Sequence, residues 1–262
     1  MKNILNLTKF LSLVLIKQKA TMFFVILSLI GIGISFLFIK TNIGIEYKLF
    51  KDLVLSMNSL FLHFISVFLT FLLLEKFKQG SISVIPLSLN IKREQYILSL
   101  FLTMIVSTLP IFLSFFIIDL AVLEILQTSK ISEFLLQVLF YYMSSILLSY
   151  IIMTAFFGLY NNTIKSITVG LITFMMGNSL DELVYFYENT KSEATKKMID
   201  AVTYIFPNFS LFDIQTYVVN SIDKNFVRIG IESTLYFIML SIILIIISVI
   251  SFRKTKVIPN DS

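Results

Sequence analysis

The side chains that could support chemistry in this chain are few. There is no cysteine, so thiolate catalysis and thiolate metal sites have no support, and one histidine, His63, cannot build a histidine-rich metal centre. No glycine is followed by a Lys-Ser or Lys-Thr pair, so the phosphate-binding loop of P-loop ATPases is absent. We therefore predict a protein that is not an enzyme and holds no catalytic, metal or cofactor-binding residue.

His63 is the most unusual of these residues, because it lies near the middle of the apolar run at 53–74. An ionisable residue inside a membrane is a functional candidate, and His63 could face a transport pathway or a dimer seam. The simpler interpretation is a neutral ring bonded to a neighbouring Ser, Thr or carbonyl. A proton relay would need carboxylates at similar depth, but we expect Asp119 and Glu75 to lie at helix ends, within reach of water.

Polar side chains recur at every fourth position of one apolar run: Gln137, Tyr141, Ser145 and Ser149. Polar groups in a membrane face other protein or a wet cavity. This line therefore predicts either hydrogen bonds between helices or contact with a substrate, with Gln137 and Tyr141 as the pathway candidates.

Small residues form a second line, in the next apolar run: Ser166, Gly170, Thr173 and Gly177. Their spacing places them on one helical stripe, where small side chains let two helices approach closely. The stripe predicts close packing within the chain or, as an alternative, a dimer seam at Gly170 and Gly177.

The elements that carry these residues are membrane helices. The chain is 57% hydrophobic and only 14% charged, too few polar residues to cover the surface of a soluble domain. A helix needs about 20 apolar residues to cross a bilayer. Six runs qualify, at residues 20–39, 53–74, 96–118, 134–157, 164–180 and 231–252. We predict an all-α polytopic membrane protein with residues 1–262 as a single transmembrane domain.

Charge placement predicts the orientation. With both termini in the cytoplasm, the cytoplasmic segments hold twelve Lys and Arg against three acids, and the outer segments hold nine against thirteen. Because Lys and Arg near the spans concentrate on the cytoplasmic side, this asymmetry indicates a cytoplasmic (inner) membrane protein. The net charge of +5 then follows from topology and needs no nucleic-acid partner.

Residues 1–19 predict an interfacial helix rather than a cleaved signal peptide. One stripe is apolar: Ile4, Leu7, Phe10, Leu11, Val14 and Leu15. The opposite side is mostly polar: Lys2, Asn6, Lys9, Ser12 and Lys17. This helix either anchors the first span or also contributes to a cytoplasmic docking surface.

The last outer loop, residues 181–230, is partly helical by its pattern. Residues 192–205 predict an amphipathic helix with Ser192 as its N-cap and Pro207 beyond its end. Residues 211–227 are apolar again, but Asp213, Asp223 and Lys224 argue against a seventh span, so we expect this segment to sink partly into the outer face.

The cytoplasmic loop at residues 75–95 begins and ends with charge and carries apolar residues around Pro86. A short amphipathic segment on the basic side of a membrane protein predicts a docking surface for a soluble partner.

Together these features resemble the membrane subunits of type-2 ATP-binding-cassette (ABC) exporters. Many members have a coupling segment that the loop matches at Glu75, Gly80, Pro86-Leu87-Ser88 and Lys92-Arg93. Many also have a Pro-x-Phe-x-x-Phe-Asp pattern before the last span, which is matched here by Pro207, Phe209, Phe212 and Asp213. The usual Arg soon after the serine is replaced by Leu89-Asn90, and the Gly80–Pro86 interval is shorter than usual.

The resemblance implies a permease subunit that moves substrate with ATP hydrolysed by a separate subunit. ATP and Mg would then bind the partner ATPase, which would dock on the loop around Pro86, and a second or related permease copy would complete a dimer. The pathway would lie between protomers, near the second and fifth spans and His63. The alternative is a non-transport anchor or scaffold for a soluble cytoplasmic partner.

Overall fold

The structure is a computed structural model that describes residues 2–40, 46–78, 92–125, 131–190, 192–213 and 226–254. These residues are almost entirely helical and include no strand, which confirms the all-α class. The helices are α1 (Lys2–Ile16), α2 (Lys19–Lys40), α3 (Glu46–Lys78), α5 (Arg93–Ile125), α6 (Ile131–Ala155), α7 (Thr163–Asn178), α8 (Leu180–Asn189), α9 (Glu193–Ile205) and α11 (Phe226–Lys254). The described residues also form a short π-helix, η1 (Phe156–Tyr160), and a 3-10 turn, η2 (Ser210–Phe212).

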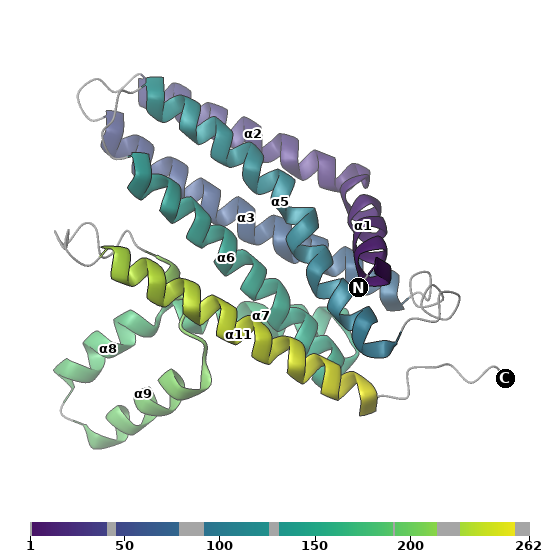
Figure 1. Ribbon diagram of the computed structural model, residues 1–262. Coiled ribbons are helices and arrows are strands. Elements are labelled where there is room, and N and C mark those ends of the chain that lie inside the picture. The colour runs from purple at the N-terminus through teal and green to yellow at the C-terminus, as the bar shows by residue number, and fades with distance from the viewer. Residues whose placement is uncertain are drawn as a thin grey trace.

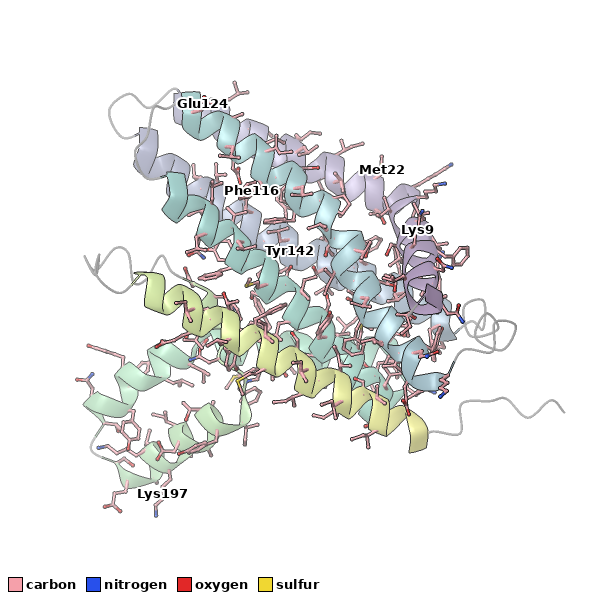
Figure 2. All side chains as sticks on the ribbon, in the orientation of Figure 1. Lys9, Met22, Phe116, Glu124, Tyr142 and Lys197 are labelled. Atoms are coloured by element: carbon pink, nitrogen blue, oxygen red, sulfur yellow. The ribbon has the colours of Figure 1, made fainter. Side chains whose placement is uncertain are left out.

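The long helices run side by side with alternating direction (Figure 1). Helix α1 caps one end of this bundle, where α3 ends, α5 begins and α11 ends. Helices α8 and α9 form a hairpin that projects away from the bundle. Lys9 on α1 and Lys197 on α9 are exposed, whereas Tyr142 lies inside the bundle (Figure 2).

Four described helices are long and apolar enough to cross a membrane, at Leu53–Lys78, Glu94–Ala121, Leu135–Gly158 and Gly230–Phe252. They overlap four of the six predicted runs, and α1 with the start of α2 forms a bent pair that would count as a fifth. Helix α7 occupies the run predicted at 164–180, but its 16 residues rise only about 24 Å, short of a bilayer core of about 30 Å. The structure therefore describes a multi-pass helical membrane protein, and six spans remain a prediction.

Helix α6 lies at the centre of the bundle and is the most buried span. Buried hydroxyl groups connect it to its neighbours, because a membrane interior offers them few other partners. The bonds are Tyr142 Oη to Ile105 O (3.0 Å), Tyr150 Oη to Phe101 O (3.2 Å), Ser149 Oγ to Ser66 O (3.4 Å) and Ser248 Oγ to Thr154 Oγ1 (3.0 Å). Helices α5, α3 and α11 are thereby joined to one scaffold.

Helix α1 packs on α5 through a face that differs from the predicted stripe. Leu7, Leu11 and Leu15 of the apolar stripe are buried, but Ser12 of the polar side is buried with them and donates a hydrogen bond to Thr103 O at 3.5 Å. Phe10 of the apolar stripe is 51% exposed. The buried face therefore does not follow the apolar stripe, because a small hydroxyl fits closely between helices, while lipid can cover an aromatic ring.

Asp119 lies in a different environment from the one expected. Its side chain, on α5, is fully buried, and Asn58 Nδ2 on α3 donates a hydrogen bond to its Oδ2 at 2.6 Å. The prediction that water reaches Asp119 at a helix end was wrong, because α5 continues to Ile125 and packs against α3. Glu75 does lie close to the end of its helix, α3, where it is half-buried.

The hairpin of α8 and α9 confirms that the segment at residues 181–230 is partly helical, as predicted. Ser192 is the N-cap of α9, where its Oγ accepts a hydrogen bond from Thr195 N at 3.4 Å. Helix α9 ends at Ile205, just before Pro207, as predicted. Most of the apolar segment predicted at 211–227 lies outside the described residues.

Candidate functional site

A polar cavity joins residues from four separate segments of the chain. It measures about 310 Å³ and is lined by Ser59 and His63 of α3, Tyr141 and Ser144 of α6, Phe174 and Asn178 of α7, and Phe209, Ser210, Phe212 and Asp213 of the segment around η2. The His63 and Tyr141 pathway candidates thus meet the Pro207–Asp213 motif at one place.

His63 is held in a defined tautomer. Its Nδ1 lies 2.6 Å from the carbonyl oxygen of Ser59, and a carbonyl can only accept, so Nδ1 carries the proton. Its Nε2 lies 2.9 Å from Ser144 Oγ and, in the neutral ring, accepts the hydroxyl proton. The ring also packs on Phe174, with centroids 4.5 Å apart. The geometry fits the neutral, hydrogen-bonded ring of the simpler interpretation while leaving His63 on the cavity wall.

The motif segment closes one end of this cavity. Phe209 and Phe212 are buried, and Phe209 packs on Phe174 at a centroid distance of 5.0 Å. Gln137 Nε2 donates to Phe212 O at 3.0 Å, and Phe209 N donates to Gly177 O at 3.2 Å. Gln137, a pathway candidate, and Gly177, a dimer-seam candidate, therefore fix the motif to the bundle.

Gly177 is required for this close approach. A Cβ atom there would meet the backbone oxygen of Pro207 and would lie 2.7 Å from Phe209 Cδ2. A Cβ atom at Gly170 would meet the side chain of Ile152 on α6. The small-residue stripe of α7 therefore packs inside the chain, against α6 and the motif.

A second, wider cavity continues from the first along α3 and α7. It measures about 640 Å³, and the lining residues that it shares with the smaller one are Ser59, His63, Tyr141, Phe174, Asn178 and Asp213. Its further wall is mostly apolar: Leu60, Phe64, Val67, Leu148 and Leu171, with Ser56. Three of these, Leu60, Phe64 and Leu171, are also exposed on the bundle surface. The groove is therefore open at its side.

The combined site is amphipathic. One end presents an imidazole, hydroxyl groups, an amide and the carboxylate of Asp213, and the other end presents aliphatic and aromatic surface. Among the lining residues that the structure describes, Asp213 is the only one with a formal charge. Ligand sites commonly combine mostly apolar walls with a few convergent polar groups, in volumes of roughly 300–1,000 Å³.

The predicted docking loop can be followed only at its two ends. Gly80, Pro86, Leu87 and Ser88 lie outside the described residues. Lys92 is exposed immediately before α5, which begins with Arg93. The docking contacts therefore stay a prediction.

The ends of that loop are anchored by an aromatic cluster that the sequence analysis missed. Phe77 of α3 is buried among Tyr96 of α5, Phe156 and Phe157 of η1, and Phe252 of α11, with ring centroids 5.9, 5.9, 5.4 and 6.1 Å away. Phe77 lies near the start of the segment 75–95 and Tyr96 directly follows its end, and these positions were the available signal. Their convergence on α11 depends on tertiary packing.

Sequence reasoning also missed Ser144, Phe174 and Asn178, because nothing in their local pattern separates them from ordinary helix residues. No group of three or more His, Cys, Asp or Glu side chains gathers in the described part of the chain as a metal site would require. Comparisons with protein-family models, curated proteins and solved structures find no match.

Proposed function

We propose that this chain is the permease subunit of an ABC transporter, an exporter that moves an amphipathic substrate across the cytoplasmic membrane. The observation that carries the proposal is the amphipathic groove between α3 and α7, closed at one end by the Pro207–Asp213 segment. A pure anchor has no use for a polar cavity inside a membrane bundle, where unpartnered polar surface is costly.

The groove suits a molecule with an apolar body and a polar head. Leu60, Phe64 and Leu171 offer apolar surface where the groove is open at its side. Asp213 offers a charged carboxylate and Tyr141 a hydroxyl group at the closed end. A substrate that carries hydrogen-bond donors or a positive charge at one end fits this distribution.

The route from ATP to the groove runs through α3. Phe77 anchors the loop end of α3 to α5, η1 and α11, so displacement of the loop would move these helices together. His63 lies on the same helix, 14 residues away or about 21 Å at 1.5 Å per residue. A force applied at the loop would therefore reach the groove along a continuous helix.

The ATPase itself would be a separate protein that binds ATP and Mg. A ligand shifts a conformational equilibrium only by its difference in affinity for the two states. ATP must therefore bind the closed ATPase more tightly, and the docking loop would transmit that difference to α3 and α5. A second permease copy, or a related one, would complete the transporter.

The distribution of basic residues supports a cytoplasmic position for the docking end. Lys76 and Lys78 lie at the end of α3, Lys92 lies just before α5, Lys9 lies on α1 and Lys17 just after it. Figure 1 shows that α1, the end of α3 and the start of α5 lie at the same end of the bundle. Short basic segments next to spans stay on the cytoplasmic side. Helices α8 and α9 would then lie toward the outer side.

Co-purification tests the proposal. The chain, solubilised mildly from its own cell membrane, is expected to retain an ATPase with an ABC signature, and combined substitution of Pro86-Leu87-Ser88 and Lys92-Arg93 is expected to release it. A preparation with no bound ATPase, or undiminished substrate export after loss of every ABC ATPase in the cell, would refute the proposal.

The scaffold alternative predicts a different response to the same loop variant. Under the scaffold reading, the variant releases a partner that need not hydrolyse ATP. Under the permease reading, it removes the stimulation of ATP hydrolysis by the permease. Measuring hydrolysis with and without the chain in lipid therefore separates the two.

A further inference from the structure

Outside the groove, one buried polar pair lacks the partners that it needs. Asn58 of α3 and Asp119 of α5 are both fully buried and share one hydrogen bond, from Asn58 Nδ2 to Asp119 Oδ2 at 2.6 Å. The other oxygen of each side chain, Asn58 Oδ1 and Asp119 Oδ1, is buried without a hydrogen-bond partner. Such orphaned atoms are uncommon in folded proteins and require an explanation.

An ionised Asp119 would be poorly accommodated here. A buried charge needs an opposite charge or several hydrogen bonds to offset its lost hydration. Among the described residues, its one partner is the neutral amide of Asn58. Asp119 lies within the candidate span Glu94–Ala121, and no described side chain other than Asn58 forms a hydrogen bond with it.

Asp119 does not pair with any other titratable or charged side chain in the described parts of the surrounding helices. These side chains are Lys9 on α1, Lys19 on α2, His63, Glu75, Lys76 and Lys78 on α3, Glu94, Tyr96 and Glu124 on α5, Tyr141, Tyr142 and Tyr150 on α6, and Glu232 and Tyr236 on α11. His63, the nearest of them to Asn58 along α3, uses both ring nitrogens elsewhere, on Ser59 and Ser144.

A single proton would satisfy both orphaned oxygens. A carboxylic acid and an amide can form a ring of two hydrogen bonds, in which the amide N–H donates to one acid oxygen and the acid O–H donates to the amide oxygen. The first bond is already present between Asn58 and Asp119. The second would join the two atoms that lack partners, with the proton on Asp119 Oδ1 and Asn58 Oδ1 as acceptor.

A metal ion fits the pair less well. Ca²⁺ takes about six to eight oxygen ligands and Mg²⁺ about six. The pair offers two free oxygens, and no further acidic or histidine side chain joins them in the described residues.

We propose that Asn58 and Asp119 form a proton-binding site, in which Asp119 is a neutral acid that joins α3 to α5 through two hydrogen bonds. The proton arrives from solvent and adds to the carboxylate, so no other reactant is needed. Loss of the proton would leave one bond and an uncompensated charge between the two helices. Because α3 also carries His63, the site would connect proton binding to the helix that lines the groove.

Infrared spectroscopy of the purified chain in lipid at neutral pH tests this directly. A protonated acid has a carbonyl stretching band that an ionised carboxylate lacks. We expect the band in the wild type and in Glu124→Gln, which removes an exposed carboxylate on the same helix, and we expect its loss in Asp119→Asn. The asparagine is nearly isosteric and supplies an N–H donor in place of the acid O–H.

Two further measurements test the protonated acid without relying on Asp119→Asn. Labelling aspartate carboxyl carbons with carbon-13 should shift the band in the unmutated chain, so the test does not depend on the folding of any variant. Asn58→Leu should move the band to higher frequency, because the acid carbonyl loses its hydrogen bond. Absence of a protonated-aspartate band overturns the proposal, as does a carboxylate signal from Asp119 that depends on added Na⁺ or Ca²⁺.

Discussion

At the scale of single residues, the groove depends on hydroxyl groups and glycines whose neighbours are distant in sequence. Ser144 completes the hydrogen bonding of His63 across two helices, whereas Ser145 beside it bonds Tyr142 O within its own helix. Neither contact can be read from the sequence, since both residues are serines in the same apolar run. The spacing of Gln137 and Tyr141 did indicate that they share one face of α6, because helical periodicity alone places residues four apart on the same face.

Ser144→Ala should destabilise the protein by about 1–3 kcal/mol, because His63 Nε2 would remain buried without a partner. Ser145→Ala is the matched control and should destabilise the protein less. The bond that it removes goes to the backbone carbonyl of Tyr142, which lies within the same helix and keeps its place in the helical backbone. Thermal unfolding in the same detergent measures both. Equal losses for the two variants would contradict the assigned bond.

Gly177→Ala should displace the motif segment, because the added Cβ meets Pro207 O and the ring of Phe209. Forced overpacking of this kind costs roughly 1–3 kcal/mol. Gly33→Ala on α2 is the control, since a Cβ there meets nothing within 4 Å, and it should be neutral or slightly stabilising. Thermal unfolding and partner ATPase activity are the readouts, and an unaffected Gly177→Ala would show that the segment does not need the close contact.

At the scale of elements, apolar runs predicted the helices well, but not which faces they bury. Within a membrane, lipid and protein are both apolar, so Phe10 gains little by turning inward while Ser12 gains a hydrogen bond. Asp119 was misplaced for a related reason: its helix extends beyond the run at 96–118 that hydropathy defined. The N-cap at Ser192 and the stop before Pro207 were predictable because both signals are local.

The aromatic cluster around Phe77 makes an element-scale prediction about coupling. Phe77→Leu should weaken the junction of α3, α5, η1 and α11 by about 0.5–1.5 kcal/mol for each aromatic pair lost. If the cluster transmits motion from the loop, ATPase stimulation should fall while the partner still binds. Phe10→Leu, at an exposed ring on α1, should leave both unchanged. Loss of partner binding in Phe77→Leu would instead assign the cluster to docking.

At the scale of the whole molecule, the arrangement of helix ends makes a prediction about sidedness. The chain has no cysteine, so single cysteines can be introduced without background. Lys92→Cys should react with a membrane-impermeant maleimide only from the cytoplasmic side, and Met198→Cys on α9, which is 71% exposed, only from the outer side. Labelling of both from one side of intact cells would contradict the topology.

The central claim is that a partner ATPase changes the groove between α3 and α7. Asn178→Cys reports on this directly, because Asn178 lines the groove and is exposed, while Tyr204→Cys on α9 is an exposed control outside it. Maleimide labelling of the chain with its ATPase in lipid should differ between nucleotide-free and ATP-trapped complexes at Asn178→Cys and stay constant at Tyr204→Cys. Equal labelling of Asn178→Cys in the two states, with ATP binding verified, would contradict the permease account.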